Sequence, residues 1–172
     1  MGSGTSYAAP LAAAVAGLCI DRDPGLADEP QALKAMLMAG GLAHNIEGDG
    51  RLSEYDGAGA VLATAVRAGY YAVTLGPADF DVNGEFEIPV DIPLEAGDPK
   101  RLVLVYTHPL ASGSAVPDPS SYDRCDLDLR LVVGGALEAQ STYGSQNPFE
   151  IIDVTPAAAA TGRLRVYRFS WD

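Results

Sequence analysis

The chain has 172 residues, of which 48% are hydrophobic, and its formal net charge is −12 at pH 7. This hydrophobic content is normal for a globular core and argues against long disorder, and the length allows one domain, or a small domain with part of another. Acidic residues outnumber basic ones, so no basic patch is expected to neutralise phosphates, which argues against nucleic-acid binding. An acidic surface favours solubility and attracts cations such as calcium.

The first predicted element is an uncharged helix that follows a short polar motif. Residues 4–10 read Gly-Thr-Ser-Tyr-Ala-Ala-Pro, and the 14 residues from Tyr7 to Ile20 include no charged side chain. A helix that is apolar on every face is buried on all sides or spans a membrane, and a span needs about 20 residues. We therefore expect a central helix of a larger domain, which the residues that follow it cannot cover completely.

The polar motif has two interpretations. Ser and Thr at a helix start, with a proline in the first turn, are ordinary helix-start residues. Alternatively, Ser6 is a nucleophile, because a helix N-terminus offers unpaired N–H donors and a positive dipole end to the oxyanion of a tetrahedral intermediate. Gly4 and Ala8 would let a substrate backbone approach closely. The length of the pattern, Gly-Thr-Ser-x-Ala-x-Pro before an apolar helix, favours the second interpretation.

This motif resembles the nucleophile-serine segment of subtilisin-like serine proteases. The resemblance implies a serine endopeptidase that acts on protein or peptide substrates through an acyl-enzyme on Ser6 and needs no cofactor for the chemistry. In that family the catalytic Asp and His precede the serine, so both would lie before Met1, in a missing N-terminal part of the catalytic domain. The chain alone is then expected to be inactive. Leu11 and Ala14 depart from the family, which often has His and Gly there.

A second helix is predicted after a polar connector at residues 21–30. Residues 28–30, Asp-Glu-Pro, favour a helix start, and the glycines at 40–41 favour its end. Its apolar face is expected to be part of the core and consists of Leu33, Met36 and Leu37.

A loop is predicted next, over residues 44–56. Its acidic residues superficially resemble a calcium loop, but the EF-hand spacing is absent, which favours a solvated acidic loop. Residues 55–65, with Gly57-x-Gly59, resemble the segment that opens the last helix of the subtilisin-like catalytic domain. A phosphate loop is the weaker alternative, because a preceding strand and a third glycine are missing.

From residue 70 the pattern changes to short runs typical of strands, separated by Gly, Pro, Ser and Asp. Residues 86–92 alternate between apolar and polar or small side chains, which has the period of a strand. Several short strands predict an antiparallel β-sandwich, with a domain boundary near residue 70. The expected strands are residues 70–75, 86–92, 101–106, 126–133, 150–155 and 163–171.

This second half resembles the C-terminal jelly-roll-like β-sandwich that some subtilisin-like proteases carry. Residues 102–109 match a strand of that domain that ends in aromatic-Thr-acid-Pro, but His108 stands in place of the acid. Residues 125–129 match its Asn-Asp-Leu-Asp-Leu strand, but Cys125 stands in place of the asparagine. Residues 147–150 and 161–166 are similar to two later segments. The expected fold is therefore α+β. Residues 1–69 would be the helical C-terminal remnant of an α/β subtilisin-like catalytic domain, and residues 70–172 an antiparallel, jelly-roll-like β-sandwich.

Asp126 and Asp128 alternate with leucines, so both carboxylates face the same side of the predicted strand. The favoured interpretation is a solvated strand face, with Leu127 and Leu129 in the core. The alternative is a structural calcium site, or hydrogen bonding to a neighbouring loop.

The two cysteines form no disulfide framework. Cys19 lies in the apolar helix and is expected to be a small buried hydrophobe, whereas a disulfide with Cys125 has no support in the spacing. The two histidines, His44 and His108, do not match the family's catalytic histidine, which precedes the serine.

Two functions from different classes remain open. The resemblance implies a secreted protease, although this chain contains no visible signal peptide. The alternative function is a non-catalytic β-sandwich module that stabilises a protease or binds a substrate or surface.

Overall fold

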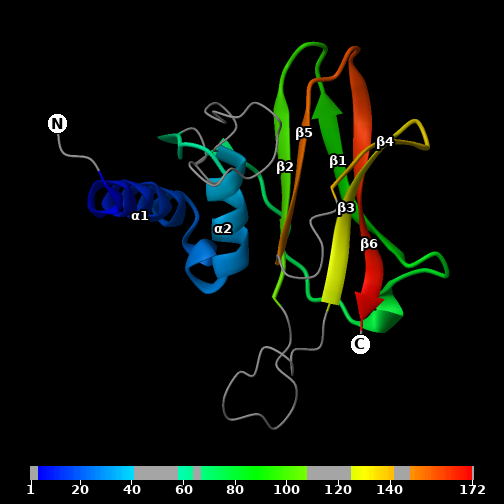
Figure 1. The fold of residues 1–172 in the computed structure, drawn as a ribbon, viewed down its shortest axis with the longest axis horizontal. Coiled ribbons are helices and arrows are strands. Elements are labelled where there is room, and N and C mark those ends of the chain that lie inside the picture. Colours follow the sequence, from blue (N-terminus) through cyan, green and yellow to red (C-terminus); the bar gives the residue numbers. More distant parts are fainter. Residues whose placement is uncertain (1–3, 41–57, 64–66, 108–124, 142–147, 172) are drawn as a thin grey trace, which may run out of the picture. The chain divides into compact units, whose positions relative to one another are not determined.

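The protein is described by a computed structural model, in which residues 4–40, 58–63, 67–107, 125–141 and 148–171 are placed (Figure 1). These ranges contain two α-helices and six strands, so the α+β fold class is confirmed. The chain divides into two compact units. The first comprises residues 1–73 together with 101–103, and the second comprises residues 74–100 and 104–172.

The first unit contains both helices. α1 spans Thr5–Arg22 and is followed by a short 3-10 helix, η1, over Pro24–Asp28. Asp23 caps η1, because its Oδ1 accepts a hydrogen bond from the Gly25 N–H at 3.1 Å. α2 spans Pro30–Ala39 and is capped by Gly40, so the predicted start at the proline and end at the glycine are both confirmed.

The core of this unit is small. Its buried side chains are Cys19, Leu26, Ala32 and Met36, and the partly buried Leu33 packs against them. The predicted core position is therefore confirmed for Met36 and Leu33, whereas Leu37 is only partly buried and lies outside the cluster. Among the residues of α1 whose burial the structure describes, Cys19 alone is buried, whereas Leu11 is 70% and Leu18 is 52% exposed. The described part of the chain therefore leaves most of this apolar helix uncovered, as expected from the sequence. Cys19 carries a free thiol, whose pKa is raised by burial.

The predicted strand at residues 70–75 is wrong, because the segment forms no strand. Strand propensity mainly measures how well a side chain fits a half-buried sheet surface, and this segment has no strand beside it. The side chains of Tyr70, Tyr71 and Val73 are 40%, 43% and 49% exposed. The Tyr70 hydroxyl instead donates to Oδ2 of Asp23 at 3.0 Å, which ties the segment to the start of η1.

Several predictions fall outside the described residues, namely the loop at 44–56, both histidines and Asn147. The segment at 55–65 is described only over residues 58–63, where it forms no α-helix. Gly59 has a φ of 92°, a backbone conformation that glycine adopts readily and other residues avoid. The expected helix is therefore absent from residues 58–63.

The six strands form two sheets (Figure 1). They belong to the second unit, except for residues 101–103 of β2. The larger sheet has the strand order β1-β6-β3-β4, with β1 at Glu85–Leu94, β6 at Ala160–Trp171, β3 at Cys125–Val133 and β4 at Ala136–Ser141. All its neighbouring strands pair antiparallel. β2 at Lys100–Val105 and β5 at Phe149–Val154 form the second sheet. Five of the six strands correspond to predicted runs.

The sequence did not predict β4. Its residues, Ala-Leu-Glu-Ala-Gln-Ser, include no β-branched or aromatic side chain, so the strand has a weak local signal. The hairpin that joins it to β3 turns at Gly134 and Gly135, whose φ values of 59° and 86° fit the tight turns preferred between antiparallel strands. Pairing with β3 therefore determines this strand.

Apolar side chains from both sheets meet in one cluster. Phe80, Leu127 and Val166 are buried at its centre, and Leu104 of β2 packs against them. On β3, Leu127, Leu129 and Leu131 are 6%, 1% and 0% exposed, and Leu129 lies opposite Val166 of the buried cluster. This confirms the predicted inward face of β3, and it fixes which side chains of that strand point to the opposite face.

Candidate functional site

Ser6 is the second residue of α1 and its side chain is exposed. Gly4 caps the helix with a φ of 131°, a backbone conformation that suits glycine and strains other residues. No atom lies within 4 Å of where a Gly4 Cβ would be, so backbone conformation, and not space, calls for glycine here. The motif thus places a serine hydroxyl on the surface at the positive end of a helix.

The backbone around Ser6 lies at the start of the helical hydrogen-bond ladder. The first intrahelical bond runs from the Ala8 N–H to the Gly4 carbonyl at 3.4 Å, so the N–H groups of residues 5–7 precede the helical ladder. Pro10 is the sixth residue of α1 rather than a member of its first turn, which corrects the expected position. It has no N–H to donate to the Ser6 carbonyl. These groups could bind an oxyanion or an extended peptide.

A general base is the missing part of this arrangement. The first turn of α1 contains no acidic residue, and both histidines lie outside the described residues. A serine hydroxyl needs an adjacent base to act as a nucleophile at neutral pH. The described residues therefore place a candidate nucleophile beside N–H groups that have no partner within the helix, and the first turn of α1 contains no acidic residue to act as the base.

The second candidate, the pair Asp126 and Asp128, is not solvated as predicted. The two residues are only 8% and 6% exposed, which makes the solvated-face interpretation wrong. The alternation with leucines is correct, but it cannot reveal that the opposite face is covered as well. Asp128 accepts a hydrogen bond from Nε2 of Gln140 on β4 at 3.3 Å. The pair therefore does hydrogen-bond to another segment, but the partner belongs to a strand, whereas the alternative expected a loop.

Burial raises the pKa of Asp128 above its ordinary value, and the neighbouring charge of Asp126 raises it further. Arg130 and the Gln140 hydrogen bond act in the opposite direction. Among the described residues, no group of three or more His, Cys, Asp or Glu side chains is placed to hold a metal ion. Calcium binding by this pair thus rests on its two carboxylates alone.

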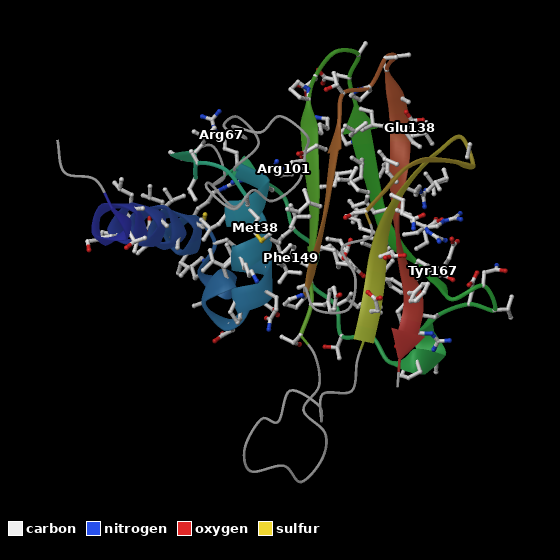
Figure 2. The ribbon with its side chains drawn as sticks, viewed as in Figure 1. Met38, Arg67, Arg101, Glu138, Phe149 and Tyr167 are labelled. Carbon is white, nitrogen blue, oxygen red and sulfur yellow. The ribbon has the colours of Figure 1, made fainter. Side chains whose placement is uncertain are left out.

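An ionic ladder crosses the face of the larger sheet opposite to the Leu129 side. Three acidic residues of β1 alternate with arginines of β6 and β3, and Tyr167 of β6 (labelled in Figure 2) lies 3.8 Å from the Arg130 guanidinium, measured to the ring centroid. The pairs are Glu85–Arg130 at 2.7 Å, Glu85–Arg165 at 2.9 Å, Glu87–Arg165 at 3.1 Å, Glu87–Arg163 at 3.0 Å and Asp91–Arg163 at 2.7 Å. Because these charges pair with one another, the ladder links β1 to β6 and to β3 through salt bridges.

A buried polar contact links β4 to β5. Glu150 is 0% exposed, and the Ser141 hydroxyl donates to its Oε2 at 2.7 Å. The same hydroxyl accepts a hydrogen bond from the Ile151 N–H at 3.1 Å. One serine therefore joins the two sheets, since β4 belongs to the larger sheet and β5 to the smaller one.

The turn before β1 is organised by one aspartate. Oδ1 of Asp81 accepts hydrogen bonds from the N–H groups of Asn83 and Glu85, both at 2.8 Å. The bond from Glu85 is the main cause that lowers the pKa of Asp81 below its ordinary value. Asp81 is therefore held as an anion in an Asx-type turn.

Comparison with known proteins assigns no family to this arrangement. A scan against models of protein families finds no match, and a search of curated proteins finds no significant match. Neither described helix is both long and apolar enough to cross a bilayer. The functional argument therefore rests on the local geometry and on the sequence motif.

The sequence did not single out the ionic ladder or the Ser141–Glu150 contact. A signal for the ladder does exist, because Glu85 and Glu87, like Arg163 and Arg165, have the two-residue spacing that places side chains on one strand face. Only the pairing of β1 with β6 brings the two sets together. The contact of Ser141 had no such signal, since β4 itself was not predicted.

Proposed function

We propose that the chain carries the nucleophile segment of a subtilisin-like serine endopeptidase, with Ser6 as the residue that forms the acyl-enzyme. The observation that carries the proposal is the position of Ser6, which is exposed in the first turn of a helix whose residues 7–20 are uncharged. The glycine cap and the donors at residues 5–7 are further support, because acyl transfer needs N–H groups that bind the developing oxyanion.

The proposed reaction is attack of the Ser6 Oγ on the scissile carbonyl of a protein or peptide. The hydroxyl proton passes to a histidine that an aspartate orients, and the acyl-enzyme is then hydrolysed. Both residues would come from the N-terminal part of the catalytic domain, which precedes the serine in this family. No cofactor is needed for these steps.

The surface of α1 agrees with such a partner. Leu11 and Leu18 are largely exposed on a helix whose residues 7–20 are uncharged. A helix of this composition is expected to be buried. The N-terminal part of the catalytic domain would cover these leucines and bring the base to Ser6.

The β-rich second unit would be the C-terminal jelly-roll-like β-sandwich of a secreted protease. Its two sheets share an apolar cluster and a buried Ser141–Glu150 contact. These features would give it a stabilising role without a part in the chemistry.

Covalent labelling by a fluorophosphonate probe tests this function. The 172-residue chain should remain unlabelled and hydrolyse no peptide, because loss of triad members costs several orders of magnitude in rate. The gene product extended upstream should be labelled on Ser6. Ser6→Ala should abolish that label, while Ser3→Ala, which changes a neighbouring hydroxyl, should retain it. Label that persists after Ser6→Ala would show that another residue is the nucleophile.

The same design separates the non-catalytic alternative, in which the β-sandwich stabilises a protease or binds a substrate or surface. Sequencing the DNA upstream of Met1 decides whether an in-frame extension encodes Asp-x-Gly and His-Gly-Thr-like motifs. A stop codon and a ribosome-binding site in their place would favour a β-sandwich module without peptidase activity.

A further inference from the structure

The turn that leads into β1 contains the one Asn-Gly pair of the sequence, Asn83-Gly84. The turn is open to water, since Asn83 is exposed and the side chain of the preceding Val82 is 101% exposed. Glycine is required at this position, because its φ is +76° and an added Cβ would lie 3.3 Å from the carbonyl oxygen of Arg168. The fold therefore retains an asparagine followed by the least hindered backbone nitrogen.

This pair can react with itself. The Gly84 backbone nitrogen attacks the Asn83 Cγ, so that an N–Cγ bond forms, the Cγ–Nδ2 bond breaks, and the side-chain nitrogen leaves as ammonia with the amide proton. The product is a five-membered succinimide. One water molecule then opens the ring at either carbonyl and leaves an aspartate or an isoaspartate. No electrons are transferred, and water is the sole co-reactant.

Asp81 binds both reacting groups. The Gly84 N–H donates to the Asp81 carbonyl oxygen at 3.0 Å, and the Asn83 Nδ2 donates to Oδ2 of Asp81 at 3.2 Å. The Asn83 N–H is held by Oδ1 of the same side chain at 2.8 Å. Attack requires the Gly84 nitrogen to leave its hydrogen bond and the Asn83 amide to turn toward it. The contacts of Asp81 therefore oppose the reaction.

We propose that Asn83 is a site of spontaneous deamidation, and that Asp81 slows this reaction through its hydrogen bonds to Asn83 and Gly84. The modification would matter for β1. Both products add a negative charge beside Asp81, and the isoaspartate also adds one methylene to the main chain next to Gly84. The Gly84 carbonyl accepts a hydrogen bond from the Arg168 N–H at 2.8 Å, and Glu85 starts the ionic ladder. A changed turn would therefore weaken the pairing of β1 with β6.

Peptide mapping by mass spectrometry, with an assay for isoaspartate, tests the proposal on the 172-residue chain in mildly alkaline buffer. We expect the acid form to accumulate at Asn83 while Asn45 and Asn147 stay intact. Asn147 is a sequence-matched reference, because it precedes Pro148, which has no N–H. Asn83→Gln should stay unmodified, since its longer side chain would need a larger ring.

The role of Asp81 has its own comparison. Asp81→Ala should deamidate several-fold faster than the natural sequence, and Asp81→Asn, which keeps an acceptor oxygen, should be intermediate. Circular dichroism shows whether each variant is folded, and a denatured sample gives the rate of the unrestrained pair. The proposal fails if Asn83 stays intact while the denatured chain converts, or if both folded Asp81 variants react no faster than the natural sequence.

Discussion

At the scale of single residues, Asp128 shows how burial changes a side chain that looks like a surface residue in the sequence. It alternates with core leucines and is itself 6% exposed, beside a second carboxylate at Asp126. Its raised pKa means that the folded state disfavours the ionised form. The stability that this group contributes is therefore fully present below its unfolded pKa, near 3.9, and is lost as the pH rises through the higher folded value.

The exchange Asp128→Asn tests whether the ionised Asp128 carboxylate lowers the stability of the folded state. The variant should raise the urea midpoint of unfolding at neutral pH, because it removes the charge and keeps an oxygen that can accept from Gln140. The gain should shrink as the pH falls toward the unfolded pKa of the carboxyl. Asp98→Asn, at a side chain that is 49% exposed, should change the midpoint little at any pH. A midpoint for Asp128→Asn that is lower at neutral pH would contradict the raised pKa.

At the scale of secondary-structure elements, the two sheets are joined by a polar contact as well as by apolar packing. The Ser141 hydroxyl donates to Glu150 and accepts from the Ile151 N–H in a buried setting. A buried group that loses its hydrogen-bond partner costs the full desolvation penalty. The contact therefore opposes separation of β4 from β5.

Ser141→Ala is the corresponding prediction. It should lower the free energy of unfolding by about 1–3 kcal/mol, because it removes a hydrogen-bond partner from Glu150 and another from the Ile151 N–H. Thr161→Ala, on an exposed position of β6, is the matched control and should cost less. Urea unfolding with an unchanged m-value measures both. Equal losses of unfolding free energy in the two variants would show that the Ser141 hydrogen bonds contribute no stability beyond that of an exposed hydroxyl.

At the scale of the whole molecule, the two units differ in how well they bury their apolar residues. The buried side chains of the second unit include residues of β3, β5 and β6, whereas the first unit exposes leucines of α1. Exposed apolar patches of this kind promote association or binding to a partner. The apolar surface of α1 is thus expected to bind another molecule or a further part of the protein.

The dye ANS, which binds exposed apolar surface, tests this. The 172-residue chain should enhance ANS fluorescence and tend to associate in light scattering. The double exchange Leu11→Lys and Leu18→Lys should reduce both signals. The same exchange on Val82 and Leu137, two exposed residues that come from separate turns and strands of the second unit, should change them less. A chain that is monodisperse in light scattering and does not enhance ANS fluorescence would contradict the exposure of the apolar residues of α1.

Local patterns in the sequence were enough for both helices and five strands. The proline at 30 and the glycine at 40 bound α2, and the alternation along β1 and β3 is visible residue by residue. These features depend on neighbours within one turn or one pleat, so the sequence by itself determined them.

Tertiary structure alone decided which segments pair as strands and what covers each strand face. Residues 70–75 have strand propensity but no strand beside them, whereas β4 has little propensity and pairs with β3. The cover over Asp128 and the partner of Ser141 come from residues of other strands, so the local period says nothing of them. Periodicity fixes which side chains share a face, but what lies against that face depends on which distant segments pair.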